Sequence, residues 1–150
     1  MVEDSVAITN LLYRYAECMD NGDFAGAAAL FGTARIRIGE GDEGLVDPAG
    51  ILANWEATVK RYADGTPRTK HVTTNAIVEI ADNGATATSR SYYCVLQQLD
   101  DFPLQPIISG RYHDQFAKVD GTWQWVERDY TMVDLIGDLS RHLTFELPQR

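Results

Sequence analysis

Residues 13–31 constrain the fold of this chain more than any other stretch. They read YRYAECMDNGDFAGAAALF, which indicates the end of one amphipathic helix, a tight break and a second short helix. The first helix is predicted over residues 4–20. Its apolar side chains recur at helical spacing and share one face, namely Leu11, Leu12, Tyr15 and Met19.

The break between the two helices falls at Asn21-Gly22, because glycine accepts the left-handed backbone conformation that ends helices. Asp23 can then cap the second helix, predicted over residues 23–31. Asp20 lies at this break, where its carboxylate can point into a cavity instead of lying on a solvated helix face.

The rest of the chain changes from helical to strand patterning. Alternation predicts a half-buried strand at residues 34–39, and Asp47-Pro48 begins a third helix that ends at residues 64–67. Residues rich in Val, Ile and Thr then predict four strands, at 70–81, 85–99, 105–118 and 122–135. Asp120-Gly121 is a strong hairpin signal between the last two.

This order of elements predicts one α+β domain over residues 1–150. Three N-terminal helices are expected to pack on one face of a strongly curved, mostly antiparallel sheet, giving a cone-shaped α+β barrel. A sheet that curls around a helix leaves a cone-shaped pocket, and such pockets bind small ligands.

The charge of the chain limits its partners. A net charge of -9 and a pI near 4.6 argue against binding of nucleic acid or an anionic membrane through bulk electrostatics. No run of about eighteen apolar residues exists, so no membrane span is expected. The first residues do not form a signal peptide pattern, and two cysteines fit buried reduced thiols, so a cytoplasmic location is expected.

Familiar catalytic and phosphate-binding motifs are absent from the sequence. The three histidines have no local metal-ligand spacing, although a metal site assembled from distant strands stays open. His71, at the start of a predicted strand, can move a proton near neutral pH if a carboxylate such as Asp20 holds its other nitrogen. Arg128 can stabilise a developing anion. Alternation puts it on one strand face with Val126, Tyr130 and Met132.

Each of these residues also has a structural interpretation. Asp20 before Asn-Gly can be a turn residue, and His71 can be a hydrogen-bonded histidine at a strand edge. Arg128 can pair at the surface with a neighbouring acid, and Tyr15 and Trp55 can be core aromatics. Spacing alone does not choose between these alternatives and an active site.

The chain resembles the SnoaL-like branch of the nuclear transport factor 2-like superfamily over nearly its whole length. The resemblance is carried by ITNLLYRY from residue 8, DNGDF from residue 20, the hairpin GRYHDQF from residue 110 with DGTW from residue 120, and GDLSRHL from residue 137. It implies the cone-shaped α+β fold described above.

Within that superfamily the chain is similar to cofactor-free lyases: scytalone dehydratase, hexachlorocyclohexane dehydrochlorinase and bile acid dehydratase. The resemblance implies an Asp20–His71 pair for proton abstraction, with Tyr15 and Arg128 as further catalytic residues. The dehydrochlorinase carries a lysine where this chain has Tyr15, which argues against dehalogenation. Expected substrate-binding residues are Trp55, Asn75, Tyr130 and Met132.

The resulting hypothesis is a cofactor-independent lyase or isomerase, of the dehydratase type, acting on a hydrophobic cyclic small molecule without a metal. The alternative is a non-catalytic small-molecule-binding module or the structural small subunit of a ring-hydroxylating dioxygenase. We expect Asp20 and His71 within hydrogen-bond reach at the floor of the largest pocket. We also expect a homo-oligomer, dimer or trimer, formed through the uncovered face of the sheet near residues 89–98.

Overall fold

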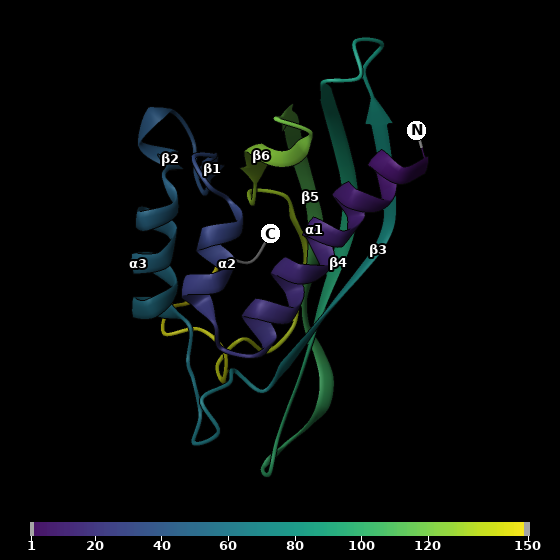
Figure 1. Ribbon diagram of the computed structural model, residues 1–150. Coiled ribbons are helices and arrows are strands. Elements are labelled where there is room, and N and C mark those ends of the chain that lie inside the picture. Colours follow the sequence, from purple (N-terminus) through teal and green to yellow (C-terminus); the bar gives the residue numbers. More distant parts are fainter. Residues whose placement is uncertain (1, 149–150) are drawn as a thin grey trace.

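The computed structural model describes residues 2–148 and is shown in Figure 1. Helix α1 (Val2–Asp20) lies across the concave side of a curved sheet, and α2 (Phe24–Leu30) and α3 (Pro48–Thr58) stand beside it. The strands are β1 (Arg35–Arg37), β2 (Leu45–Val46), β3 (Thr69–Ile80), β4 (Thr86–Leu99), β5 (Phe102–Val119), β6 (Thr122–Asp129) and β7 (Val133–Ile136). A short 3-10 helix, η1 (Asp42–Gly44), precedes β2.

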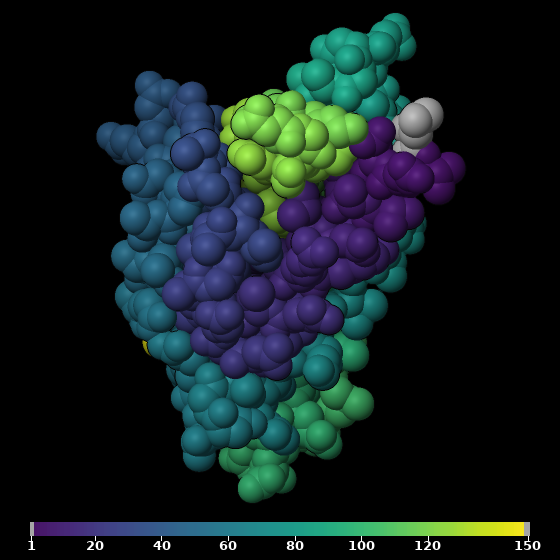
Figure 2. Space-filling view, viewed as in Figure 1, coloured from purple at the N-terminus to yellow at the C-terminus, as the bar shows by residue number. Residues whose placement is uncertain are grey.

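The sheet order is β2-β1-β6-β5-β4-β3, and β7 pairs separately with β5. All pairs are antiparallel except β1 with β6. Three helices on a curved, unclosed and mostly antiparallel sheet confirm the predicted α+β cone. The space-filling view shows helices α1 and α2 covering the sheet from this side (Figure 2).

The break between α1 and α2 forms as the sequence predicts. Gly22 has φ 74°, and a Cβ added there would lie 2.1 Å from the carbonyl oxygen of Gly65, so glycine is needed twice over. Asp23 accepts a hydrogen bond of 2.8 Å from the backbone N–H of Gly26 and caps α2. One face of α1 then packs into the core through Ile8, Leu12, Tyr15, Ala16 and Met19.

Helix α3 ends at Thr58, so the predicted end at residues 64–67 is wrong. Val59 is extended and forms an isolated bridge with Leu143 of the C-terminal segment. The backbone N–H of Lys60 donates to the carbonyl oxygen of His142 at 2.8 Å. Pairing with a segment about eighty residues away therefore replaces the last helical turns.

Two strand boundaries also differ from the prediction. β5 begins at Phe102 instead of residue 105, and a register shift at Pro106 absorbs the missing backbone donor. The last predicted strand is divided after Asp129, whose Oδ1 accepts from both the backbone N–H and the hydroxyl of Thr131. This local turn separates β6 from β7. In the described part of the chain, no helix is long and apolar enough to cross a membrane.

Candidate active site

Asp20 and His71 form a buried pair between the end of α1 and the start of β3. Asp20 Oδ1 lies 2.5 Å from His71 Nδ1, and Oδ2 accepts the backbone N–H of His71 at 2.8 Å. The hydroxyl of Thr69 donates to Oδ1 at 2.9 Å. The two side chains are 9% and 8% exposed. The carboxylate is thus fixed by three contacts from a neighbouring strand, which a turn residue does not require.

The position of Asp20 has an electrostatic cost. It is the last residue of α1, where the partial negative charge of a helix C-terminus disfavours a carboxylate. Three donors from β3 offset this repulsion.

Tyr15 lies beside the pair, five residues before Asp20 on the inner face of α1. Its ring centroid is 6.2 Å from that of His71, at an interplanar angle of 82°. Burial raises the pKa of Tyr15, and the positive charge of Arg128 offsets part of that rise. The phenol therefore stays protonated near neutral pH and can donate a hydrogen bond.

Arg128 and Asp114 form a second buried pair deeper in the cone. Arg128 Nε donates to Asp114 Oδ1 at 2.7 Å and Nη2 donates to Oδ2 at 3.0 Å, and both side chains are fully buried. Trp125 Nε1 also donates to Asp114 Oδ1, at 3.0 Å. Burial acts to lower the pKa of Arg128, but Asp114, Tyr130 and Tyr112 raise it well above its usual value. Arg128 is therefore a fixed cation. Because its partner Asp114 is buried, the alternative of a surface ion pair between Arg128 and a neighbouring acid is wrong.

Aromatic rings enclose the Arg128 guanidinium. Its Cζ lies 3.9 Å from the ring centroid of Tyr112 and 4.6 Å from that of Tyr15, which is cation–π geometry. Three further rings lie within 5.7 Å, those of Trp125, Tyr130 and Phe31. Within residues 2–148, Arg128 Nη1 and the Tyr130 hydroxyl are buried and make no hydrogen bond of normal geometry. Tyr15 and Arg128 are nevertheless the polar neighbours of the Tyr130 hydroxyl, so the three side chains form one cluster.

A β-bulge in β6 aims Arg128 inward. Gln115 pairs with Glu127 and Phe116 with Trp125, so Val126 is the extra residue. Val126 is exposed whereas Trp125 and Arg128 are buried. The predicted common face for Val126 and Arg128 is therefore wrong, because strict alternation does not continue across a bulge.

The other predicted substrate-binding residues are only partly brought together. Trp55 is buried with its ring centroid 6.1 Å from that of Tyr15, and the Tyr130 ring lies 5.5 Å from that of Tyr112. Met132 is half-buried, and its carbonyl oxygen accepts the backbone N–H of Arg111. Asn75 is exposed at an irregularity of β3, with φ 54°, and lies outside this buried cluster.

Sequence reasoning missed several residues of this cluster, above all Thr69, Asp114, Tyr112 and His142. Thr69 and Asp114 had a usable signal. Thr69 lies two residues before His71 on a strand and so shares its face. Asp114 lies between Tyr112 and Phe116 at the same spacing, and an acid between two buried aromatics on one strand face needs a buried partner.

The depressions on the surface do not match the expected position of the pair. A depression of about 540 Å³ borders Asp20 and His71, and its wall includes Tyr13, Lys70 and Thr73. A larger one of about 780 Å³ is lined by the C-terminal segment, within residues 136–148. The prediction that the pair lies in the largest pocket is therefore wrong.

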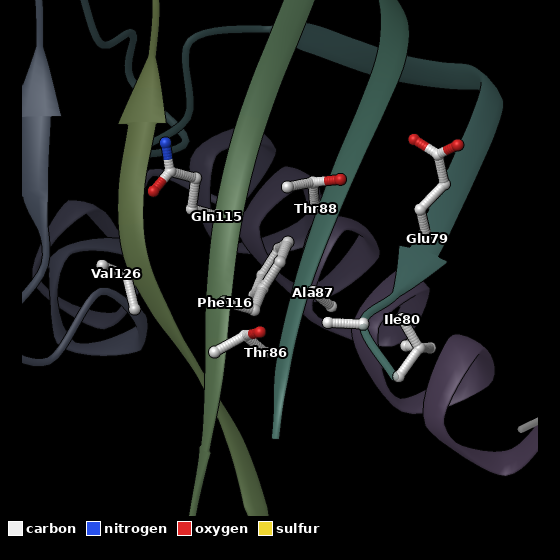
Figure 3. Close-up of a pocket in the computed structure, with 9 residues that line it drawn as sticks. Glu79, Ile80, Thr86, Ala87, Thr88, Gln115, Phe116 and Val126 are labelled. Atoms are coloured by element: carbon white, nitrogen blue, oxygen red, sulfur yellow. The ribbon is translucent and has the colours of Figure 1, made fainter. Parts of the chain in front are cut away.

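A third depression, of about 440 Å³, lies across β3, β4, β5 and β6 (Figure 3). Its lining includes Thr88, Gln115 and Val126 and does not include Asp20 or His71. In residues 2–148, no group of three or more His, Cys, Asp or Glu side chains is arranged to hold a metal ion.

The protein is a small α+β cone with an aspartate–histidine pair at the end of its first helix, and its sequence match places it in the nuclear transport factor 2-like superfamily. A sequence model of the SnoaL-like domain matches residues 1–129, and the chain belongs to that family. A search of curated protein sequences finds no significant match to this chain.

Solved structures support the fold. A nuclear transport factor 2-like protein with a cystatin-like fold from Novosphingobium aromaticivorans has a TM-score of 0.70 and 20% identity, with 89% of this chain and 84% of that chain covered. A protein from the same organism, assigned as a scytalone dehydratase, has a TM-score of 0.65 and 18% identity, with 89% and 86% covered. The beta subunit of a protein assigned as an aromatic-ring-hydroxylating dioxygenase, also from that organism, has a TM-score of 0.65 and 19% identity, with 88% and 90% covered.

Proposed function

We propose that this protein is a cofactor-independent lyase or isomerase that abstracts a proton from a hydrophobic cyclic small molecule. The observation that carries the proposal is the buried contact of 2.5 Å between Asp20 Oδ1 and His71 Nδ1. Similarity to a protein assigned as a scytalone dehydratase adds support for dehydratase-type chemistry.

His71 is the general base in this proposal. Because Asp20 accepts at Nδ1, the neutral imidazole carries its hydrogen there and leaves the Nε2 lone pair free. Nε2 takes the proton from a carbon next to a carbonyl group, and Asp20 stabilises the imidazolium that forms. Thr69 keeps the carboxylate in place.

Tyr15 and Arg128 polarise the substrate oxygen. The electron pair of the broken C–H bond moves towards the carbonyl oxygen, where the phenol of Tyr15 and the cation of Arg128 stabilise the negative charge. In a dehydration, the hydroxyl group leaves with its bonding electrons and takes the proton from the imidazolium, giving water. In an isomerisation, the imidazolium returns the proton to a different carbon.

The aromatic surroundings favour an apolar ring as substrate. Trp55, Tyr112 and Tyr130 pack around Tyr15, so the surroundings of this phenol are aromatic. The charges in this interior are already paired within the protein, so a charged substrate would have no free counterion there.

A turnover screen tests this function. A panel of cyclic β-hydroxy ketones and cyclic enones is incubated with the protein, and dehydration or isomerisation is followed by ultraviolet absorbance. We expect turnover of at least one member by the wild-type chain and none by His71→Gln. Equal turnover by the two proteins would contradict the proposal.

A non-catalytic role is the second candidate, and the similarity to a dioxygenase beta subunit supports it. In that role the Arg128 and Asp20 clusters would be structural. Copurification with a large iron–sulfur oxygenase subunit, combined with no turnover in the screen, would favour this candidate.

We also propose a homo-oligomer, a dimer or trimer, that covers the face of the sheet opposite the helices. Register joins Val72, Cys94, Ser109 and Leu135 in one row across β3, β4, β5 and β7. Leu135 is 69% exposed and the nearby Tyr92 is 52% exposed. A second copy would remove these apolar groups from water. Light scattering that gives only a 16.7 kDa species at micromolar concentration would rule this out.

A further inference from the structure

The C-terminal segment that follows β7 is tied closely to the rest of the fold. The carbonyl oxygen of His142 accepts the backbone N–H of Lys60 at 2.8 Å, and Thr144 N–H donates to the carbonyl oxygen of Thr58 at 2.9 Å. The buried amide of Gln97 donates to the carbonyl oxygen of Arg141 at 3.1 Å. These contacts fix the backbone on both sides of His142.

The fixed backbone buries the His142 side chain, which is only 8% exposed. Its Nδ1 is fully buried and has no hydrogen-bond partner within residues 2–148. Buried polar atoms are nearly always paired, so an unpaired ring nitrogen in a firmly held segment needs an explanation.

His142 lies near the Asp20–His71 pair. It follows Arg141, whose carbonyl oxygen accepts from Gln97, and Gln97 pairs across β3 and β4 with Thr69, the residue that donates to Asp20. Burial and a positive charge on His71 together lower the pKa of His142 to about 4, although Asp20 acts in the opposite direction. Hence His142 is neutral near pH 7. It also stays neutral when His71 takes up a proton, because two neighbouring imidazolium ions repel each other.

We propose that His142 Nδ1 is the point at which a hydroxyl group of the ligand binds, beside the Asp20–His71 pair. This inference rests on the proposed function and deepens it, because it assigns the substrate to the hydroxyl-bearing class. A hydroxyl group can donate and accept, so it satisfies Nδ1 in either tautomer of the neutral ring. A carbonyl oxygen can satisfy only the tautomer that carries hydrogen on Nδ1.

The rival explanation is a resident buried water that satisfies Nδ1 and never leaves. A ligand hydroxyl would replace such a water, whereas a structural water would keep its place. The two explanations therefore differ in how the His142 ring responds to a small hydroxylated probe.

Nitrogen NMR of the histidine rings makes this test on the wild-type protein. The chain has three histidines, and the spectra of His113→Gln and His71→Gln assign those two rings, so the remaining resonances belong to His142. The probes are phenol and toluene, which have nearly the same shape and differ in the hydroxyl group. We expect phenol, but not toluene, to shift the Nδ1 resonance of His142.

Two variants sharpen the result. Asparagine retains a polar atom near the position of Nδ1, whereas leucine replaces the ring with apolar atoms. His142→Leu is expected to weaken phenol binding roughly three- to tenfold, the effect of one lost hydrogen bond, and His142→Asn to restore most of it. Toluene binding should be the same in both variants.

A shift of His71 by phenol without any shift of His142 would overturn this inference and leave the proposed function standing. So would equal phenol affinity in His142→Leu and the wild type. If phenol shifts neither ring up to its solubility limit, the inference is also overturned, and the turnover screen then judges the proposed function by itself.

Discussion

Two buried aspartates in the cone have partners of different chemistry. Asp114 pairs with Arg128, and both side chains are fully enclosed. Asp20 pairs with His71, and both side chains are nearly as buried, but they border a depression of about 540 Å³. Each carboxylate accepts three hydrogen bonds from the surrounding strands.

The partner of each aspartate makes the difference. A guanidinium keeps its proton at any working pH, so Asp114 and Arg128 supply a constant field inside the cone. An imidazole can take up a proton, so in the proposed mechanism the Asp20–His71 pair changes its charge. Burial and hydrogen bonding alone therefore do not distinguish the two pairs, and the proposal that Asp20 and His71 react depends on the chemistry of the partner.

The largest expected effect comes from breaking the constant pair. Asp114→Ala leaves the guanidinium of Arg128 buried without its carboxylate, which should cost about 3–5 kcal/mol of unfolding free energy. Urea titration measures the loss. Glu79→Ala, which breaks the exposed pair with Arg90, is the control and should leave the midpoint unchanged within error. Similar losses of unfolding free energy in the two variants would show that the buried pair stabilises the fold no more than the exposed pair does.

Breaking the reactive pair should affect rate more than stability. His71→Gln keeps the size and one hydrogen bond but cannot take a proton, so turnover should fall on the order of a hundredfold or more. Asp20→Asn should also be severe, because it removes the charge that stabilises the imidazolium. Steady-state rates and thermal melting are measured on the same samples. Near-normal turnover in a folded His71→Gln protein would contradict the division of roles.

The third prediction concerns pH and the buried ring of His142. The ordinary pKa of a histidine is 6.5, whereas the pKa of His142 is about 4 in the folded protein. Between these two pH values the unfolded chain therefore binds more protons than the folded protein. Stability is therefore lost as pH falls from 6.5 towards 4. Between pH 6.5 and 5 the loss should be about 2 kcal/mol in the wild type and absent in His142→Leu. Parallel pH profiles of the two proteins would refute this account.

The smallest effect is expected at the support of Asp20. Thr69→Val keeps the shape but removes the hydroxyl that donates to Asp20 Oδ1, which should cost about 1 kcal/mol of unfolding free energy. Thr74→Val, at an exposed position of the same strand, is the matched control and should be neutral. Equal melting temperatures for the two variants would mean that Thr69 does not hold the carboxylate.

Local signals in the sequence predicted the helix break, the helix caps and the hairpin. Asp120 and Gly121 both have positive φ, at 49° and 79°, and connect the paired residues Val119 and Thr122 as the two-residue turn predicts. The chemistry of the two side chains made Asp20 a candidate partner of His71, and the family resemblance favoured that pairing. Such signals depend on a few neighbouring residues, which one sequence displays directly.

Long-range contacts and irregular strands were not predictable in the same way. The end of α3 depends on pairing of Val59 with Leu143, and the partner of Arg128 comes from β5 instead of its sequence neighbours. The bulge at Val126 reverses the alternation that was used to assign strand faces. In each case the structure depends on a contact with a distant segment or on a local irregularity of a strand. Neither can be read from the residue types of the segment itself.

Solvent deuterium exchange tests the central claim, that His71 abstracts a carbon-bound proton, most directly. Cyclohex-2-enone is incubated in deuterated buffer with the wild type, with His71→Gln and with the control His113→Gln, and deuterium uptake is followed by proton NMR. We predict that the wild type and His113→Gln accelerate exchange at the acidic ring carbon, and that His71→Gln does not exceed the buffer rate. Exchange by His71→Gln at the wild-type rate, or no exchange by the wild type, would contradict the claim.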